Sequence, residues 1–144
     1  MRVLIHSTNR SEPCIDELEV YGPEDRTNFA LAKLGASASA SSCLPGYSIH
    51  QIAHLNDGLY GNSHSWIAAS TKGEWAQVEL RRPVQVSRVD LSRDREGHYV
   101  DRVPIKVDVL VSMDGEAWQT VAQMKNLAPK IPTAGRLRNF RVVC

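Results

Sequence analysis

The sequence predicts an all-β fold, an antiparallel β-sandwich. Apolar and polar residues alternate along several short segments, which is the period of a strand with one buried face. Turn-forming residues separate these segments, and no long amphipathic helical pattern lies between them. Short strands without crossover helices favour a sandwich over a parallel sheet of βαβ units.

The clearest predicted strand covers residues 105–111. Its apolar face is formed by Ile105, Val107, Val109 and Val111. Asp114-Gly115 follows, a dipeptide that favours a tight hairpin, and the segment 118–122 alternates again. We therefore expect these two segments to pair antiparallel through a tight turn.

Further strands are predicted on both sides of this hairpin. They cover residues 2–7, 15–21, 76–80, 89–92 and 139–143. In the second of them, Leu18 and Val20 share one face and Glu17 and Glu19 share the other. This strand is expected to bury its Leu18 face.

Two segments have other patterns. Residues 48–55 have helical spacing of apolar side chains for one or two turns, ended by Asn56-Asp57-Gly58. Residues 36–42 alternate Ala and Ser, which is compatible with a tightly packed edge strand and equally with a linker.

Length and composition limit the possible functions. A chain of 144 residues suits one domain spanning 1–144, and 42% apolar with 23% charged residues excludes a disordered or collagen-like chain. With a net charge of +1, the chain has no overall positive potential that would attract nucleic acid or an anionic membrane, so the sequence does not predict a general binder of either. No stretch approaches the roughly 18 apolar residues of a membrane span. The apolar run at residues 3–5 is too short for the core of a signal peptide, and localisation stays open on this evidence.

The cysteines do not form a disulfide framework. Cys14, Cys43 and Cys144 have no C-x-x-C spacing. Cys14 and Cys43 would bridge if they lay on neighbouring strands in an oxidising compartment, and are otherwise small buried thiols.

Several segments together resemble the discoidin family, the coagulation factor V/VIII type C domains of the galactose-binding-like superfamily. They are Asn28-Phe29-Ala30-Leu31-Ala32 as opening strand, Leu55-Asn56-Asp57-Gly58, Ser65-Trp66, the W-x-x-V-x-L pattern from Trp75, residues 86–91, the S-x-D-G-x-x-W pattern from Ser112, and residues 17–22. The resemblance implies a jelly-roll sandwich. It also implies a non-catalytic glycan- or polysaccharide-binding module within a larger, extracytoplasmic multidomain protein. The alternative is a structural or protein-interaction domain without a sugar site.

The order of these segments departs from the family pattern. A strand like residues 17–22 normally closes the domain, whereas here it precedes the segment that begins at Asn28. We interpret residues 1–22 as permuted closing strands and 28–144 as the main body. The alternative is that 1–22 is the tail of a preceding domain.

The resemblance implies a structural calcium ion. Carried over by position, Asp57 and Glu17 would supply carboxylates and Ser65 a hydroxyl, with backbone carbonyls near His54 and Asn62 completing the oxygen ligands. The alternative is that Asp57 caps a turn and that Glu17 is solvated or bonded to loop amides.

Residues 92–102 form the candidate ligand site. Charges of both signs surround a histidine and a tyrosine, a mixture suited to gripping sugar hydroxyls and covering an apolar sugar face. The candidate residues are Arg93, Arg95, His98 and Tyr99, with Tyr60 and His64 from another loop. The alternative is a set of Arg–carboxylate pairs that hold a long loop in place.

Catalysis is weakly supported. His50 and His54 have i, i+4 spacing and would share a transition metal with Cys43 or His64, but the chain lacks H-E-x-x-H. The G-x-S-x-G elbow is also absent. Three tryptophans, Trp66, Trp75 and Trp118, are expected in the core rather than on a sugar platform.

Overall fold

The computed structural model describes residues 1–24, 26–125 and 134–143, the last of these as backbone only. Its strands are β1 (Arg2–Thr8), β2 (Cys14–Ile15), β3 (Glu17–Tyr21), β4 (Ser37–Ala40), β5 (Trp66–Ile67), β6 (Glu74–Glu79), β7 (Gln85–Ser92), β8 (Pro104–Val111), β9 (Gln119–Lys125) and β10 (Ala134–Val143). Two short 3-10 helices, η1 (Ala32–Leu34) and η2 (Ile52–Leu55), lie between β3 and β5. The predicted all-β class is confirmed.

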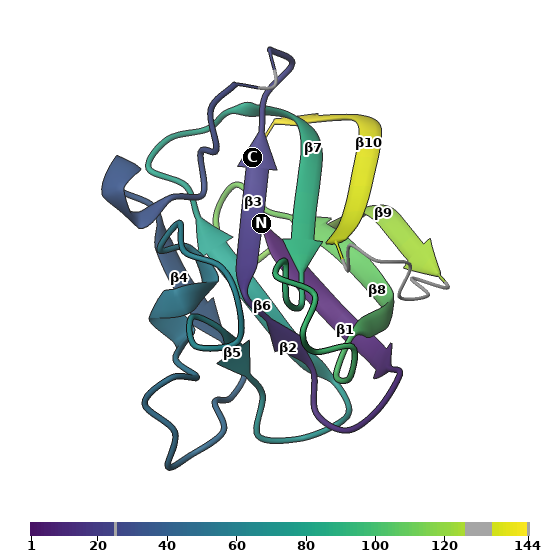
Figure 1. Ribbon diagram of the computed structural model, residues 1–144. Helices are drawn as coiled ribbons and strands as arrows, with labels where there is room; N and C mark the ends of the chain where they lie inside the picture. Colours follow the sequence, from purple (N-terminus) through teal and green to yellow (C-terminus); the bar gives the residue numbers. More distant parts are fainter. Residues whose placement is uncertain (25, 126–133, 144) are drawn as a thin grey trace.

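Two antiparallel sheets face each other and enclose the core. One has five strands in the order β4-β6-β1-β8-β9, and the other has three in the order β10-β7-β3. The three-stranded sheet lies in front of the larger one in Figure 1. Strands β2 and β5 form a separate small pair. The sandwich predicted from the sequence is therefore present.

The core follows the predicted alternation. One cluster of buried apolar side chains contains Val107 and Val109 of β8 together with Leu18 and Val20 of β3. Trp66 is the largest fully buried side chain in it. Full burial of each such side chain stabilises the fold by about 1.5–3 kcal/mol.

The N-terminal segment is part of the sandwich. Strand β1 lies between β6 and β8, and Val3 is paired with both Ala76 and Val109. Strand β3 pairs with β7, with Leu18 opposite Leu91. The prediction that the N-terminus supplies a closing strand is confirmed.

Two local predictions require correction, those for residues 28–32 and for the β8–β9 turn, and two others take a definite form in the structure. Residues 28–32 are not a strand: the Asn28 side chain accepts hydrogen bonds from the backbone N–H groups of Val20 and Ala30, and the chain turns there. The strand comes later, as β4, where the Ala–Ser segment pairs with β6 as an edge strand rather than a linker. The helical turn is confined to η2. The β8–β9 hairpin is antiparallel as predicted, but residues 112–118 form a longer loop, in which Asp114 accepts N–H groups of Glu116 and Ala117.

Two of the three tryptophans lie outside the core. Trp75 has the opposite parity to Ala76 and Val78, so it stands on the outer face of β6. The Arg2 guanidinium lies 4.1 Å from the ring centres of both Trp75 and Trp118. The expectation of core packing is confirmed for Trp66 only.

The two described cysteines are free thiols. Cys14 is buried on β2, and burial raises the pKa of its thiol to about 11. Cys43 is half-buried, and its thiol donates to the carbonyl of His50 at 3.3 Å. The Cys14–Cys43 bridge is not formed, and Cys144 lies outside the described residues.

Candidate functional site

The candidate site lies where the loop between η2 and β5 meets the loop between β7 and β8. Buried carboxylates at the start of β3 organise both loops. Asp16 Oδ2 accepts the backbone N–H groups of Gly61 and Arg95, each at 3.0 Å. Its Oδ1 accepts the hydroxyl of Ser92. One carboxylate therefore ties the two loops together.

Glu19 fixes an arginine–tyrosine pair above it. This buried carboxylate accepts hydrogen bonds from the hydroxyls of Tyr21 at 2.8 Å and Tyr60 at 3.1 Å, and it pairs with the Arg95 guanidinium. The guanidinium lies 4.1 Å from the Tyr60 ring centre. Burial, with the neighbouring charge of Glu19, raises the pKa of Tyr60. The structure thus brings Arg95 and Tyr60 together on a partly exposed surface.

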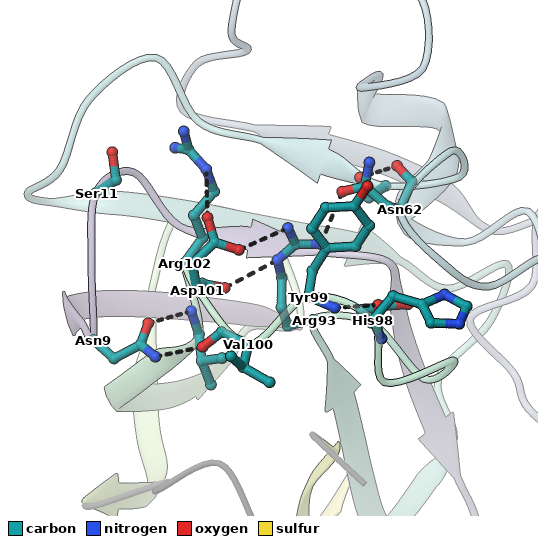
Figure 2. Close-up of polar contacts among 12 residues, drawn as sticks. Asn9, Ser11, Asn62, Arg93, His98, Tyr99, Val100, Asp101 and Arg102 are labelled. Carbon is teal, nitrogen blue, oxygen red and sulfur yellow. Dashed lines mark hydrogen bonds and ion pairs between the residues drawn. The ribbon is translucent and has the colours of Figure 1, made fainter. Parts of the chain in front are cut away.

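Arg93 is embedded in the β7–β8 loop, as Figure 2 shows. Its side chain is 2% exposed, and it donates to the Asp101 carbonyl at 3.0 Å, to Asp101 Oδ1 at 3.2 Å and to Asn62 Oδ1 at 3.1 Å. The Tyr99 ring lies over the guanidinium at 5.2 Å. These contacts are those of an arginine that holds a loop in place.

His98 and Tyr99 are exposed on the same loop. Asp94 Oδ2 accepts the backbone N–H groups of both at 2.8 Å, which fixes the loop and leaves the side chains at the surface. The His98 side chain is 71% exposed and lies 3.7 Å from Glu96. Tyr99 is 46% exposed.

The end of this loop adopts an uncommon backbone conformation. Arg102 has a φ of 59°, in the left-handed region that non-glycine residues rarely adopt. Its guanidinium pairs with Glu12. Nearby, Asn9 donates to the Val100 carbonyl at 2.6 Å and accepts from the Val103 N–H at 2.9 Å (Figure 2). Side-chain contacts from the β1–β2 connection therefore hold the loop where it enters β8.

The calcium ligands predicted from the resemblance are only partly together. Glu17 is fully buried; its Oε2 accepts the Gly58 N–H at 3.2 Å, and its Oε1 has no hydrogen-bond partner among the described residues. Burial, reinforced by the nearby charges of Asp57, Glu19 and Asp16, raises the pKa of Glu17 to about 9. Such a carboxyl holds a proton at neutral pH unless a cation replaces it. An unpartnered oxygen beside a second carboxylate fits a hard cation such as Ca²⁺.

Asp57 and Ser65 have other contacts. Asp57 Oδ1 caps the turn through the Leu59 N–H at 2.7 Å, and Oδ2 lies 3.2 Å from His64 Nδ1. The Ser65 hydroxyl donates to the Asn62 carbonyl at 2.9 Å and lies 2.8 Å from Nδ1 of the buried His50. Among the described residues, the Ser65 hydroxyl therefore bonds to Asn62 and His50 rather than to Glu17 or Asp57.

The histidines pair differently from the sequence-based expectation that His50 and His54 would share a metal ion. His50 is bonded to Ser65, and burial lowers its pKa. His54 instead approaches His64, with ring centres 5.2 Å apart. Sequence patterns did not identify Asp16 or Glu19 as site residues, because their importance comes from loops that are distant in the sequence. The only local signal was the run of acidic residues at the start of a strand.

Comparison with known protein families gives one match. The sequence profile of the F5/8 type C domain family matches residues 37–141, which is most of the chain. The matched region begins at β4, so β1, β2 and β3 lie outside it, although β1 and β3 belong to the two sheets of the same sandwich. No significant match to a curated protein or to a solved structure is found.

Proposed function

The chain belongs to the F5/8 type C, or discoidin, family, and on that premise we propose that it is a glycan-binding module of a larger extracytoplasmic protein. Discoidin domains are generally non-catalytic and often bind carbohydrates or proteins. They usually occur in extracellular proteins. Among the described residues, no helix has the length and apolar character to cross a membrane.

The observation that carries the proposal is the Arg95–Tyr60 pair. Glu19 orients both side chains before any ligand arrives, which reduces the entropy that binding would cost. Tyr60 is 38% exposed, so part of its ring is free to cover the apolar C–H face of a sugar, while Arg95 donates to hydroxyls. In this proposal His98 and Tyr99 contribute from the rim.

The other predicted ligand residues support the site from outside it. Arg93 shapes the loop through Asp101 and Asn62 rather than by reaching the sugar. His64 lies beside Asp57 and orients the loop that carries Tyr60.

We also propose a structural Ca²⁺ ion beneath this loop. Glu17 and Asp57 would be its carboxylate ligands, and loop carbonyls would supply further oxygens. The unpartnered Glu17 Oε1 supports this proposal. In it, Ser65 acts by orienting the Asn62 carbonyl.

A glycan array followed by calorimetric titration tests the proposed function. Arg95→Ala should weaken binding about 10- to 100-fold, the effect of losing hydrogen bonds from a charged donor. Tyr60→Phe, which keeps the ring but loses the hydrogen bond to Glu19, should weaken binding less than Arg95→Ala does. Arg81→Ala, at an exposed position between β6 and β7, is the matched control. Unchanged affinity in Arg95→Ala, or no binding to any glycan, would reject the proposal.

One observation favours a second candidate, a protein-interaction domain. Arg2 is stacked between Trp75 and Trp118 on the outer face of the five-stranded sheet, and tryptophan and arginine dominate the energetics of protein interfaces. A chain that binds no glycan but loses a protein partner in Trp75→Ala would support this candidate.

A further inference from the structure

A cluster of two histidines and one aspartate lies on the loop that follows η2. Donor atoms of His54, Asp57 and His64 all lie within 4.8 Å of one another. Ligands about 2.0–2.2 Å from a zinc ion are roughly 3.3 Å apart in a tetrahedral site, so small side-chain rotations would suffice. We propose that these three residues bind a divalent transition-metal ion of the zinc type. Nothing in this inference depends on glycan binding.

His54 is already oriented as a ligand. Its Nδ1 lies 3.2 Å from the Ile49 carbonyl and 3.3 Å from the Ser65 carbonyl. Both partners are acceptors, so Nδ1 carries the proton and Nε2 keeps its lone pair. Metal-binding histidines usually donate their other ring N–H in this way, which fixes both tautomer and ring orientation.

His64 and Asp57 supply the other donors. Without an ion, His64 Nδ1 donates a hydrogen bond to Asp57 Oδ2 at 3.2 Å, a separation close to that of two ligands in a tetrahedral site. A bound ion would displace this proton and take up both atoms. The His54 and His64 rings are inclined at 56° with centres 5.2 Å apart, so they are tilted rather than stacked flat on each other. Their side chains are half-buried, so an ion has access from solvent and water would occupy the remaining position.

The ligand types set the class of metal. Two imidazoles with one carboxylate suit Zn²⁺ and its neighbours in the transition series, whereas Ca²⁺ takes oxygen ligands. The proposed calcium position differs because it needs Glu17, which contacts Gly58 and not the histidines. The two positions share Asp57, so variants of Glu17 and His64 separate them.

An ion held this way would link η2 to the loop that carries Tyr60. His54 belongs to η2, whereas Asp57 and His64 lie on either side of Tyr60 in the sequence. Binding would therefore restrain the Tyr60 loop from its outer side, in addition to the Asp16 contact with Gly61.

The test is titration of the full chain at constant Ca²⁺, with Zn²⁺ alone by calorimetry and with Co²⁺ alone by visible absorption. We expect one equivalent of Zn²⁺ to bind and Co²⁺ to give the intense d–d bands of a tetrahedral site. His64→Gln and His54→Gln should each reduce Zn²⁺ affinity by at least about tenfold. Glu17→Gln should not weaken Zn²⁺ binding, because the variant removes only a ligand of the competing Ca²⁺ position. His98→Gln, at an exposed histidine beside Glu96, is the matched control.

Three results would overturn the inference. They are absence of Zn²⁺ binding to the parent chain, unchanged affinity in a folded His64→Gln variant, and an equal loss in His98→Gln. Thermal melts in chelator establish that each variant is folded. His64→Gln alone decides the matter if His54→Gln, which also loses its carbonyl contacts, fails to fold. Because no glycan enters these measurements, their failure is distinct from failure of the proposed function.

Discussion

The Arg95 guanidinium carbon lies over Tyr60, 4.1 Å from the ring centre, and the same buried carboxylate, Glu19, bonds to both side chains. This pair is held in place in the absence of a ligand. Its orientation depends on Glu19, which belongs to β3. The stability of the fold and the geometry of the candidate site are therefore coupled at Glu19.

Glu19→Gln should destabilise the chain by about 2 kcal/mol, because it leaves the Arg95 charge without its buried partner. The same variant should weaken glycan binding by releasing Arg95. Chemical denaturation and calorimetric titration measure the two effects. Glu96→Gln removes an exposed carboxylate nearby and should change neither. A Glu19→Gln variant as stable as the parent chain would contradict the coupling.

Arg93→Ala should lower the free energy of unfolding by about 3 kcal/mol, since Asp101 and Asn62 lose a buried charged donor. Arg10→Ala, at an exposed position, should be neutral in the same denaturant experiment. If Arg93→Ala kept full stability and lost only glycan affinity, Arg93 would be a direct ligand residue rather than a support for the loop.

Stability in chelator should fall as pH rises, because of Glu17. Its folded pKa, about 9, lies above the ordinary value, so the folded chain binds the proton more tightly than the unfolded chain. The protonated Glu17 carboxyl therefore contributes to the free energy of unfolding. This contribution is complete below the unfolded pKa of about 4.5 and is lost as pH rises towards the folded pKa of about 9. The free energy of unfolding should fall by at most about 1.4 kcal/mol per pH unit in this range.

Glu17→Gln, which resembles the protonated carboxyl, should flatten this pH dependence. Thermal or denaturant unfolding between about pH 6 and about pH 8 measures it. A parent chain and a Glu17→Gln variant with the same pH profile would show that Glu17 titrates normally.

Added Ca²⁺ should raise the unfolding midpoint. At a concentration 100-fold above its Kd, Ca²⁺ should raise the free energy of unfolding by about 2.7 kcal/mol. Glu17→Gln and Asp57→Asn should each abolish the increase, because each removes a charged ligand. Glu116→Gln, exposed in the β8–β9 loop, should retain it. A midpoint that Ca²⁺ does not change in the parent chain would argue against the calcium proposal.

The alternation of side chains made the sandwich predictable. Parity alone places Leu18 and Val20 on one face of a strand, and both are fully buried. Trp75 borders an apolar strand pattern, which favours the core, but it shares the parity of Gln77 and therefore lies on the outer face of β6. Asn28 was assigned to a strand from the family resemblance, whereas its side chain caps a turn.

The candidate site was less predictable than the fold. Arg95 and Tyr60 were both named from their loops, but their contact depends on Glu19, which local sequence places simply on the polar face of a strand. The roles of Asp16 and Glu17 likewise arise only when residues 57–61 fold over β3. Such contacts join segments far apart in the chain, and no periodic pattern records them.

The Asp16 anchor has a consequence for engineering new specificities on this sandwich. Because a single oxygen accepts the N–H of Gly61 and that of Arg95, changing the length of one loop ahead of its anchor point would also shift the other. Randomised libraries should therefore leave Asp16 and the spacing to both amides untouched. Diversity is better introduced at a surface position such as His98, whose side chain is exposed and has no contact with Asp16.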